Sequence, residues 1–417
     1  MKRKGSKPRH FAVEALEYEW KMSKDSKGSG KTAGIDNIWP TEFAKNLDDN
    51  LRRISNEISS KNFGFKKLKV VAIPKDNGKQ RIICIPTVGD RLVQRRIVRL
   101  LTTDKSEDKK YLSKKLGLEN NPIIYGLGDN VRKNSGVQDA IKRVIKVRKD
   151  FPWVLKTDIQ SFFDSIDRKF LNDEFKKRFK GIAFADLVEK AINCEADDRK
   201  KSLLEENGIK KGVGIRQGMP LSPILSNFFL RSFDQNVSKK IGSKNIIRYA
   251  DDIIVLGKSK KECEDFHLFI EDELKKINLE IPSLSGAKSK TRIVAPNDSV
   301  TFLGIEIYKG RDGEYGQNID PKKCEEIKGN FRTEFTFEDA LKNKMTLSKL
   351  LQRFESKVRG YQEAYKGTDN LNSFIKELEE IKQSSQKELM KNIFGSDVFE
   401  KLSPEQKQFL GFEIPKE

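Results

Sequence analysis

Two apolar runs that flank a pair of carboxylates decide the fold: Ile246-Ile247-Arg248-Tyr249-Ala250-Asp251-Asp252-Ile253-Ile254-Val255-Leu256. β-Branched residues dominate both runs, which predicts two strands joined by a tight turn. An Ala-Asp-Asp turn is ordinary hairpin chemistry, and by itself it indicates a solvated turn. Whether these carboxylates perform chemistry therefore depends on the rest of the chain.

A third carboxylate lies near the end of another predicted strand. Trp153–Ile159 is mostly apolar and carries Asp158, and a helix is predicted over Phe162–Phe175. If this strand neighbours the Asp251-Asp252 hairpin, about 4.8 Å away, the three carboxylates meet at one sheet edge. Two Mg²⁺ ions about 3.5–4 Å apart relieve such crowding and are the usual device for in-line phosphoryl transfer. The arrangement therefore favours metal-assisted chemistry on phosphates.

The composition limits the classes of protein to which the chain can belong. Its 417 residues carry 82 Lys+Arg against 62 Asp+Glu, a formal net charge of +20, and 36% of them are hydrophobic. A chain of this length with 26 Phe can bury a large core, which excludes a wholly disordered protein. The excess of positive charge predicts a polyanionic partner.

Cysteine, histidine and hydropathy exclude further classes. The four Cys lie far apart and the chain has two His, so we expect no zinc site, no disulfide framework and no His general base. No run reaches the roughly 18 apolar residues of a membrane span, and the N-terminus does not resemble a signal peptide. We therefore expect a cytoplasmic enzyme whose chemistry rests on carboxylates, metals and cationic side chains.

Other segments complete the predicted elements. Lys69–Pro74 and Arg81–Pro86 predict a hairpin around Asn77-Gly78. The turn-rich Arg216–Pro223 segment predicts a helix start, with Ser222 as the N-cap and a Pro as the first helical residue. Further predicted elements are helices over Asp90–Leu101 and Phe266–Leu279, a strand over Val300–Ile307 and an all-helical region from Asp320, with a boundary near 310–320.

Taken in order, these segments resemble the motifs of a bacterial, group II intron-like reverse transcriptase over roughly residues 31–367. The matching motifs are Lys31-Thr32-Ala33-Gly34-Ile35-Asp36, the 73–86 hairpin, Asp158–Asp167, Gln217-Gly218 with Ser222-Pro223, Tyr249-Ala250-Asp251-Asp252, Lys290-Thr291, Phe302-Leu303-Gly304 and Arg359-Gly360-Tyr361. Each motif alone is weakly to moderately specific, but the ordered set with the YADD box is highly specific. The resemblance implies an RNA-directed DNA polymerase, a nucleotidyltransferase that copies RNA into cDNA.

The resemblance implies an α+β fold shaped as a right hand. Its palm would be an antiparallel sheet backed by helices, and its thumb would be helical. The implied domains are an N-terminal extension and fingers at 1–150, palm at 151–171, a fingers insertion at 172–215, palm with the YADD motif at 216–315, and thumb with C-terminal tail at 316–417.

The resemblance also assigns roles to residues of this sequence. Asp158, Asp251 and Asp252 would be catalytic and would hold two Mg²⁺ ions, for which Mn²⁺ can substitute. The carbonyl of Ile159 would add a metal ligand. Phe163, five residues after Asp158, would lie against the sugar and exclude a 2′-hydroxyl, so that dNTPs are the substrates. The other residues implied to bind the nucleotide are Lys75, Arg81, Gln217 and Lys290.

The positive excess would serve an RNA template and the RNA–DNA duplex. Neutralising phosphates releases counterions and gives a salt-dependent affinity with little sequence readout. The candidate contacts are Lys66, Lys67, Lys69, Arg353, Lys357 and Arg359. A single cationic cluster of this kind is more often solvent-exposed surface without a partner. Only the clusters taken together predict nucleic-acid binding.

The kind of reverse transcriptase is inferred from missing motifs. We find no nuclease module, no RNase H-like segment, and neither the Asn-Ala-x-x-His nor the Val-Thr-Gly element of retron enzymes. The chain thus looks most like the stand-alone reverse transcriptases of bacterial antiviral defence, which are paired with a noncoding RNA. The alternatives are a retron or group II intron-type enzyme, a maturase acting as an RNA-binding splicing factor, and an RNA or template-independent polymerase on the same palm.

Overall fold

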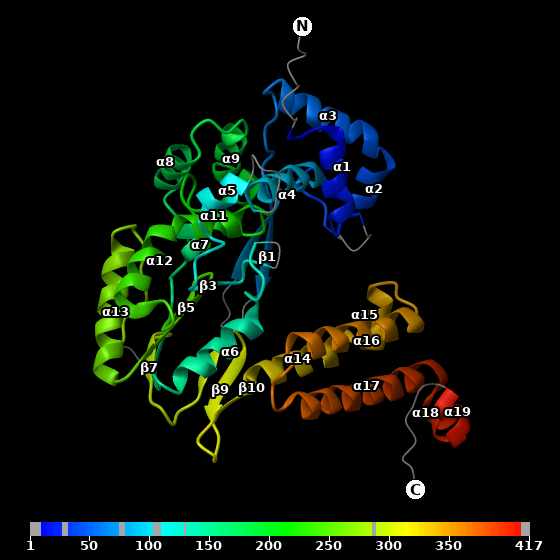
Figure 1. The fold of residues 1–417 in the computed structure, drawn as a ribbon. Helices are drawn as coiled ribbons and strands as arrows, with labels where there is room; N and C mark the ends of the chain where they lie inside the picture. The colour runs from blue at the N-terminus through cyan, green and yellow to red at the C-terminus, as the bar shows by residue number, and fades with distance from the viewer. Residues whose placement is uncertain are drawn as a thin grey trace. The chain divides into compact units, whose positions relative to one another are not determined.

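The computed structural model describes residues 10–26, 32–74, 80–102, 110–128, 131–285 and 289–409. The chain divides into two compact units, many of whose elements are labelled in Figure 1. Unit 1 comprises Met1–Ala140 with Leu155–Ile293, and unit 2 comprises Ile141–Val154 with Val294–Glu417. The boundaries of fingers, palm and thumb stay predictions. No helix of the described ranges is long and apolar enough to cross a membrane.

The first part of unit 1 is a cluster of helices that ion pairs hold together. Helix α1 packs on α3 and α4. Just after α1, the buried Asp25 binds Arg91 at 3.4 Å and Arg95 at 2.7 Å, both on α4. The helices of this part are α1 (Val13–Met22), α2 (Pro40–Lys45), α3 (Leu47–Ser59), α4 (Val88–Thr102) and α5 (Lys110–Leu116).

A β-hairpin lies between α3 and α4 in the sequence. Strands β1 (Lys69–Pro74) and β2 (Gln80–Ile85) pair antiparallel, with Pro74 opposite Gln80. This register confirms the predicted hairpin, and α4 confirms the helix predicted after it. The turn at 75–79, which includes the predicted nucleotide contact Lys75, lies outside the described residues.

The centre of unit 1 is a five-stranded sheet in the order β3-β5-β6-β4-β7. Strands β5 and β6 form an antiparallel hairpin that pairs Tyr249 with Asp252, and β3 runs parallel to β5. Residues 253–256 of β6 are fully buried, because both faces of this strand are covered. The strands are β3 (Ile124–Tyr125), β4 (Trp153–Asp158), β5 (Ile246–Tyr249), β6 (Asp252–Gly257) and β7 (Arg292–Val294).

Helices cover this sheet and supply much of its core. Helix α13 contacts both β6 and α12, and stacked rings of Phe175 and Phe179, 4.5 Å apart, meet Phe228 of α11. The helices of the rest of unit 1 are α7 (Phe162–Ser165), α8 (Arg168–Arg178), α9 (Ala185–Ile192), α10 (Lys201–Glu206), α11 (Ser222–Phe229), α12 (Arg231–Val237) and α13 (Lys260–Lys275).

Two helix predictions need correction. The helix predicted over Phe162–Phe175 is two helices, because Ile166 is extended and Asp167 starts α8 by accepting a hydrogen bond from the N–H of Phe170 at 3.0 Å. Ser222 is the first residue of α11 but does not cap it, since its hydroxyl donates to the carbonyl of Arg216 at 2.8 Å. That bond ties the loop before α11 to the helix.

Unit 2 combines a small sheet with a helical bundle. The strand predicted over Val300–Ile307 is instead a hairpin, because Leu303 and Gly304 adopt φ of 53° and 77° and turn the chain between β8 and β9. All-helical structure then follows from Asp320 as predicted, and the fold class α+β is confirmed. The elements are α6 (Val137–Arg148), β8 (Val300–Phe302), β9 (Ile305–Lys309), β10 (Tyr315–Ile319), α14 (Pro321–Glu334), α15 (Phe337–Lys342), α16 (Leu347–Ala364), α17 (Leu371–Phe394), α18 (Ser396–Glu400) and α19 (Pro404–Phe409).

Candidate active site

The ends of two neighbouring strands bring the predicted aspartates together. Strand β4 ends at Asp158, and β6, its neighbour in the sheet, begins at Asp252. The N–H of Ile159 donates to the carbonyl oxygen of Asp251 at 3.0 Å, which joins the end of β4 to the β5–β6 turn. The three carboxylates therefore lie at one edge of the sheet, as the sequence predicts.

The carboxylates of this edge affect one another electrostatically. Burial raises the pKa of Asp251, and the negative charge of Asp158 raises it further. Burial and the charges of Asp251 and Asp158 raise the pKa of Asp252 to about 6, against the opposing charge of Lys156. A cation placed among these groups would relieve this repulsion and favour the charged form of the carboxylates.

Asp158 has one oxygen that the protein leaves unsatisfied. Its Oδ2 accepts a hydrogen bond from Nζ of Lys290 at 2.8 Å, whereas its Oδ1 is buried and has no hydrogen-bond partner in the described part of the chain. A buried carboxylate oxygen without a partner is costly and suits a metal ion. Lys290, predicted to bind the nucleotide, thus lies at the aspartates and supplies positive charge there.

The aspartates do not by themselves form a complete metal cage. Within the described ranges, no group of three or more His, Cys, Asp or Glu side chains is arranged to hold a metal ion. Mg²⁺ commonly binds through one or two carboxylates and completes its octahedron with substrate phosphates and water. The residues present therefore fit Mg²⁺ that arrives with a nucleotide, and its binding by Asp158, Asp251, Asp252 and the Ile159 carbonyl stays a prediction.

The backbone is strained next to both strand ends. Ser161, three residues after Asp158, has φ of 45°, and Ala250, which precedes Asp251, has φ of 54°. A non-glycine residue in this left-handed region costs about 1–3 kcal/mol, and such residues concentrate at functional sites. The carbonyl of Ser161 accepts from the N–H groups of Asp164 and Ser165, so local hydrogen bonds hold this conformation.

The loop that carries Gln217 packs directly on the β-hairpin. The N–H of Cys84 on β2 donates to the carbonyl of Gln217 at 2.7 Å. Gly218 has φ of 103°, and a Cβ there would lie 2.6 Å from the carbonyl oxygen of Cys84, so only glycine fits. Arg81, exposed on β2, lies close enough to the aspartates for its charge to oppose the raised pKa of Asp251. The charge of Arg81 thus reaches the aspartates, and its predicted contact with the nucleotide's phosphates stays a prediction.

Phe163 is held by backbone and ring contacts. It is half-buried, its ring packs on Phe162 with centroids 5.4 Å apart, and its carbonyl accepts from the N–H of Ile215 at 2.7 Å. The position predicted to touch the sugar is therefore fixed by the 215–218 loop. Its contact with a nucleotide stays a prediction.

Glu195 is a structural centre that sequence reasoning missed. Its carboxylate binds Arg168 at 2.7 Å and Arg216 at 2.8 Å and accepts from the N–H of Gly212 at 2.8 Å. Burial acts to raise the pKa of Glu195, but these hydrogen bonds hold it below its usual value. The cluster fixes the segment that leads into Gln217. No sequence spacing links Glu195 to its two arginines, although Arg216 directly precedes Gln217.

The cations predicted to bind nucleic acid on unit 1 differ in availability. Lys67 forms an ion pair with Asp198, and Lys66 lies 3.8 Å from Asp36. Lys69 lines a surface cavity of about 440 Å³ together with Arg199 and Lys200. Their contact with nucleic acid stays a prediction, and Lys69 is the best placed of the three.

The predicted cations on α16 of unit 2 are engaged within that unit. Arg353 binds Glu334 at 2.7 Å and Asp339 at 3.4 Å, and Lys357 also binds Glu334. Arg359 is about three-quarters exposed and lies 3.5 Å from Glu355. Phosphates would have to displace carboxylates at the first two positions, so Arg359 is the most accessible candidate.

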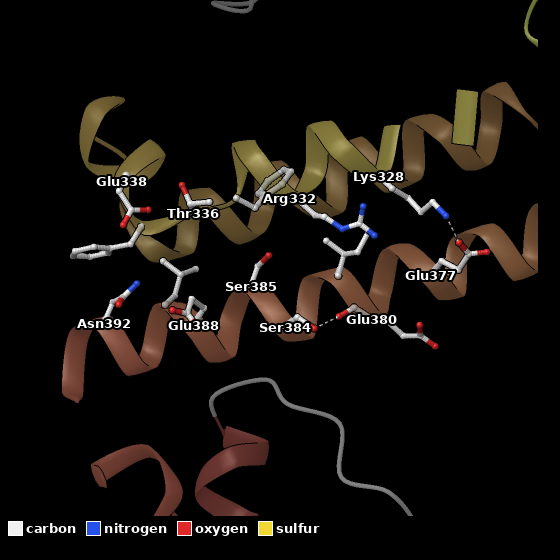
Figure 2. A pocket seen from close by; sticks show the side chains of 14 residues that line it. Lys328, Arg332, Thr336, Glu338, Glu377, Glu380, Ser384, Ser385, Glu388 and Asn392 are labelled. Atoms are coloured by element: carbon white, nitrogen blue, oxygen red, sulfur yellow. Dashed lines mark hydrogen bonds and ion pairs between the residues drawn. The ribbon is translucent and has the colours of Figure 1, made fainter. Parts of the chain in front are cut away.

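A cavity of about 580 Å³ lies on unit 2 between α14, α15 and α17, as Figure 2 shows. Lys328 and Arg332 line one side, but Lys328 is already bound to Glu377 at 2.6 Å. The four carboxylates that line the cavity are those of Glu338, Glu377, Glu380 and Glu388. They outnumber the cations and disfavour phosphate. None of the predicted site residues lines this cavity.

Comparison with known proteins agrees with these observations. Residues 73–307, more than half of the chain, match the family described as reverse transcriptase (RNA-dependent DNA polymerase). The chain is 26% identical over 341 residues to Protein YkfC of Escherichia coli, covering 71% of this chain and 81% of that protein. It is 27% identical over 194 residues to the Retron Ec83 reverse transcriptase of Escherichia coli, covering 44% of this chain and 51% of that enzyme.

A fungal relative matches over a smaller share of its own length. The chain is 27% identical over 188 residues to the uncharacterized 91 kDa protein in the cob intron of Schizosaccharomyces pombe, covering 45% of this chain and 21% of that protein. The similarity to the retron enzyme and to this intron protein therefore covers less than half of this chain and says nothing about the rest of it. The region matched by the family model contains the strand-end aspartates, the YADD turn and the loop before α11. The chain belongs to the reverse transcriptase family, the RNA-dependent DNA polymerases.

Proposed function

We propose that the chain copies RNA into cDNA by two-metal-ion nucleotidyl transfer at Asp158, Asp251 and Asp252. The observation that carries the proposal is the hydrogen bond from the N–H of Ile159 to the carbonyl of Asp251, which joins the two strand ends. The buried, unpartnered Oδ1 of Asp158 supports a cation at the same place. Within the described ranges, no other carboxylates combine joined strand ends and a buried unpartnered oxygen with a place inside the region that matches the reverse transcriptase family.

Each residue around the aspartates has a separate task in this proposal. When bound, Mg²⁺ lowers the pKa of the attacking 3′-hydroxyl and neutralises the leaving pyrophosphate. Asp158 and Asp251, with the carbonyl of Ile159, would hold it, and Asp252 would complete the negative charge of the site. Arg81 and Lys290 would bind the nucleotide's phosphates, Lys290 after exchanging its bond to Asp158 for one to phosphate.

Substrate selection falls to residues that the 215–218 loop holds in place. Gln217, whose carbonyl is bound to β2, would contact the nucleotide near its sugar and base. Phe163, fixed by the same loop, would leave no room for a 2′-hydroxyl. Lys75 would join Arg81 in binding the nucleotide's phosphates. Together these contacts favour dNTPs over rNTPs.

The test is extension of a DNA primer on an RNA template with dNTPs and Mg²⁺. Asp251→Asn keeps the side-chain shape but removes the charge, so we expect a roughly 1000-fold or larger loss of rate. Asp265→Asn is the matched control, because Asp265 lies exposed on α13 in an ion pair with Lys261. Wild-type rates in Asp251→Asn, or no extension by the wild type on any RNA template, would overturn the proposal.

The template is a noncoding RNA that stays bound to the protein, and its copying serves antiviral defence in the bacterial cytosol. The resemblance to stand-alone defence enzymes and the net charge of +20 support this part of the proposal. Purifying the protein from its host and sequencing the bound RNA, and any cDNA made on adding dNTPs and Mg²⁺, tests it.

The defence role has its own readout. If it is correct, a single structured RNA copurifies, and Asp251→Ala with Asp252→Ala abolishes protection in phage plating. Absence of such an RNA together with unchanged plating would contradict the role. Intron splicing that survives Asp251→Ala in a polymerase-dead protein would instead favour the maturase alternative.

A further inference from the structure

Behind the YADD turn lies a fully buried ion pair that the proposed chemistry does not use. Arg248, on β5, and Asp234, on α12, have no solvent-exposed side-chain surface. Nε of Arg248 donates to Oδ1 of Asp234 at 2.7 Å, and Nη2 donates to Oδ2 at 2.6 Å. The two groups thus form a bidentate pair, which fixes the orientation of the guanidinium plane.

The third nitrogen of the guanidinium reaches the catalytic turn. Nη1 of Arg248 donates to Oδ1 of Asn227 on α11 at 2.9 Å and to the carbonyl oxygen of Ala250 at 2.9 Å. Ala250 is the turn residue with φ of 54°, and its carbonyl belongs to the peptide group that begins Asp251. Because a peptide group is planar, holding this carbonyl also orients the N–H and Cα of Asp251.

The other side of the ion pair is also anchored. Nδ2 of Asn121 donates to Oδ2 of Asp234 at 3.1 Å, and Oδ1 of Asn121 accepts from the N–H of Ile123 at 3.2 Å. The N–H of Arg248 in turn donates to the carbonyl of Ile123 at 2.8 Å. Asn121, in the loop before β3, therefore holds Asp234, and Asp234 of α12 and Asn227 of α11 together hold the guanidinium of Arg248.

Packing alone does not require these charges. A buried ion pair can often be replaced by apolar residues of similar size without loss of stability, whereas removing one partner leaves a costly lone charge. Apolar replacements would nevertheless leave the carbonyl of Ala250 without its donor. Apolar residues would also lose the bonds to Asn227 and Asn121, but the bond to the Ala250 carbonyl is the one that connects the pair to the catalytic turn.

We propose that Arg248 is a positioning residue for polymerisation: oriented by Asp234, it holds the Ala250 carbonyl and thereby places Asp251 and Asp252 for metal binding. This inference rests on the proposed function for its link to catalysis. It adds to that function a support that reaches from α11 and α12 through β5 to the turn between the two strands (Figure 1). Arg248 does not touch the substrate in this scheme.

The test separates positioning from folding with a pair of variants. Arg248→Met alone leaves Asp234 buried and unpaired, so its melting temperature should fall. Arg248→Met combined with Asp234→Leu removes both charges and should regain most of that loss. We nevertheless expect the double variant to keep a roughly 10-fold or larger deficit in kcat and a raised half-saturating Mn²⁺ concentration, with KM for dNTP changed less.

Mn²⁺ binding, followed by electron paramagnetic resonance without substrate, gives a readout that does not depend on activity. Wild-type kcat and wild-type Mn²⁺ affinity in the double variant would overturn the proposal, because the pair would then be structural only. Wild-type protein that binds Mn²⁺ but extends no primer would instead contradict the proposed function. In that case weaker Mn²⁺ binding by the double variant would still support the positioning role.

Two further variants guard against failure to fold. Arg248→Lys keeps a positive charge opposite Asp234, but a single Nζ cannot reproduce the three-way fork, so we expect near-normal melting with weakened Mn²⁺ binding. Arg148→Met, in unit 2, removes another fully buried arginine. It should lower the melting temperature, but the molecules that remain folded should bind Mn²⁺ with wild-type affinity. Wild-type Mn²⁺ affinity in a folded Arg248→Lys protein would contradict the proposal.

Discussion

Arg248 in unit 1 and Arg148 in unit 2 are both fully buried, and they are stabilised in different ways. Arg248 in unit 1 is neutralised by Asp234. Arg148 in unit 2 donates to the carbonyls of Ile307, Ala295 and Asp298 at 2.7–3.2 Å, and its guanidinium lies 4.5 Å from the centre of the Tyr315 ring. Burial lowers the pKa of Arg148, against the opposing charge of Tyr315 and Asp298.

The difference shows what each arginine does. Arg148 ties the carbonyl of Ile307 on β9 to the carbonyls of Ala295 and Asp298 between β7 and β8. These acceptors are dipoles, which would only be left without a donor if Arg148 were removed. Arg248 has a charged partner and ends at the turn that carries two of the proposed catalytic aspartates. A buried arginine that serves the framework and one that serves a site can therefore be told apart by their partners. Removing each of them should have different consequences.

The largest expected effect on stability is that of Arg248→Met. The variant leaves Asp234 as a lone buried carboxyl, so we expect a loss of about 3–5 kcal/mol in the free energy of unfolding near neutral pH. Burial raises the folded-state pKa of Asp234, against Arg248 in the wild type. Without Arg248, stability is retained below the unfolded pKa of about 3.9 and lost as the pH rises through the folded pKa.

Urea denaturation at pH 5 and pH 8 measures this dependence. The destabilisation by Arg248→Met should be greater at pH 8, and adding Asp234→Leu should abolish the difference between the two pH values. Equal destabilisation at both pH values would show that Asp234 is not the source of the instability.

Arg148→Met should have a smaller effect. It leaves carbonyl acceptors without a donor, which costs about 1–3 kcal/mol, and it leaves no ion-paired carboxylate behind, because the hydrogen bonds of Arg148 to Ile307, Ala295 and Asp298 go to backbone carbonyls. The same urea experiment should therefore find a loss in unit 2 that does not change between pH 5 and pH 8. A pH-dependent loss comparable to that of Arg248→Met would remove the contrast between the two buried arginines.

Phe163→Val addresses substrate selection at the site that Arg248 supports. Removing ring volume at the predicted sugar contact should lower discrimination between dNTP and rNTP by roughly 10–100-fold, the range expected when the fit of a pocket to one small group changes. The measurement compares kcat/KM for matched dNTP and rNTP on one RNA template. If the wild type already uses both equally well, Phe163 is no steric barrier and an RNA polymerase becomes the better assignment.

The smallest expected effect concerns the charges of the turn. The pKa of Asp252 is raised from 3.8 to about 6. In the metal-free protein, the contribution of Asp252 to folding stability is therefore fully present below pH 3.8 and is lost as the pH rises through 6. Mg²⁺ should therefore raise the melting temperature by a few degrees more at pH 7.5 than at pH 5. Asp252→Asn should reduce that difference, and an equal Mg²⁺ effect at both pH values would contradict a metal site at Asp252.

Local patterns of the sequence predict the strands and their carboxylates. β-Branched runs around Ala250-Asp251 and the apolar run before Asp158 depend on neighbours in sequence, so they can be recognised without the fold. The break at Asp167 and the turn at Leu303 cannot be recognised in this way. Asp167 interrupts a predicted helix because it caps a new one, and Leu303 interrupts a predicted strand because it adopts a left-handed conformation, and sequence patterns reveal neither.

The support behind the turn is beyond sequence reasoning for a different reason. Arg248 is a charged residue inside an apolar strand, which is a local signal that it needs a partner. Its partner Asp234 is on a helix 14 residues earlier, where an aspartate usually faces solvent. Only the packing of α12 against the sheet brings the two together, just as tertiary structure brings Glu195 to Arg168 and Arg216.

We propose that the aspartates at the ends of β4 and β6 form one metal-dependent polymerase site. The most direct test counts bound Mn²⁺ by electron paramagnetic resonance in a complex with an RNA template, a dideoxy-terminated DNA primer and the matching dNTP. We predict two Mn²⁺ per wild-type protein and fewer than two in Asp158→Asn and in Asp251→Asn. No bound Mn²⁺ in the wild type, or an unchanged count in both variants, would contradict the claim.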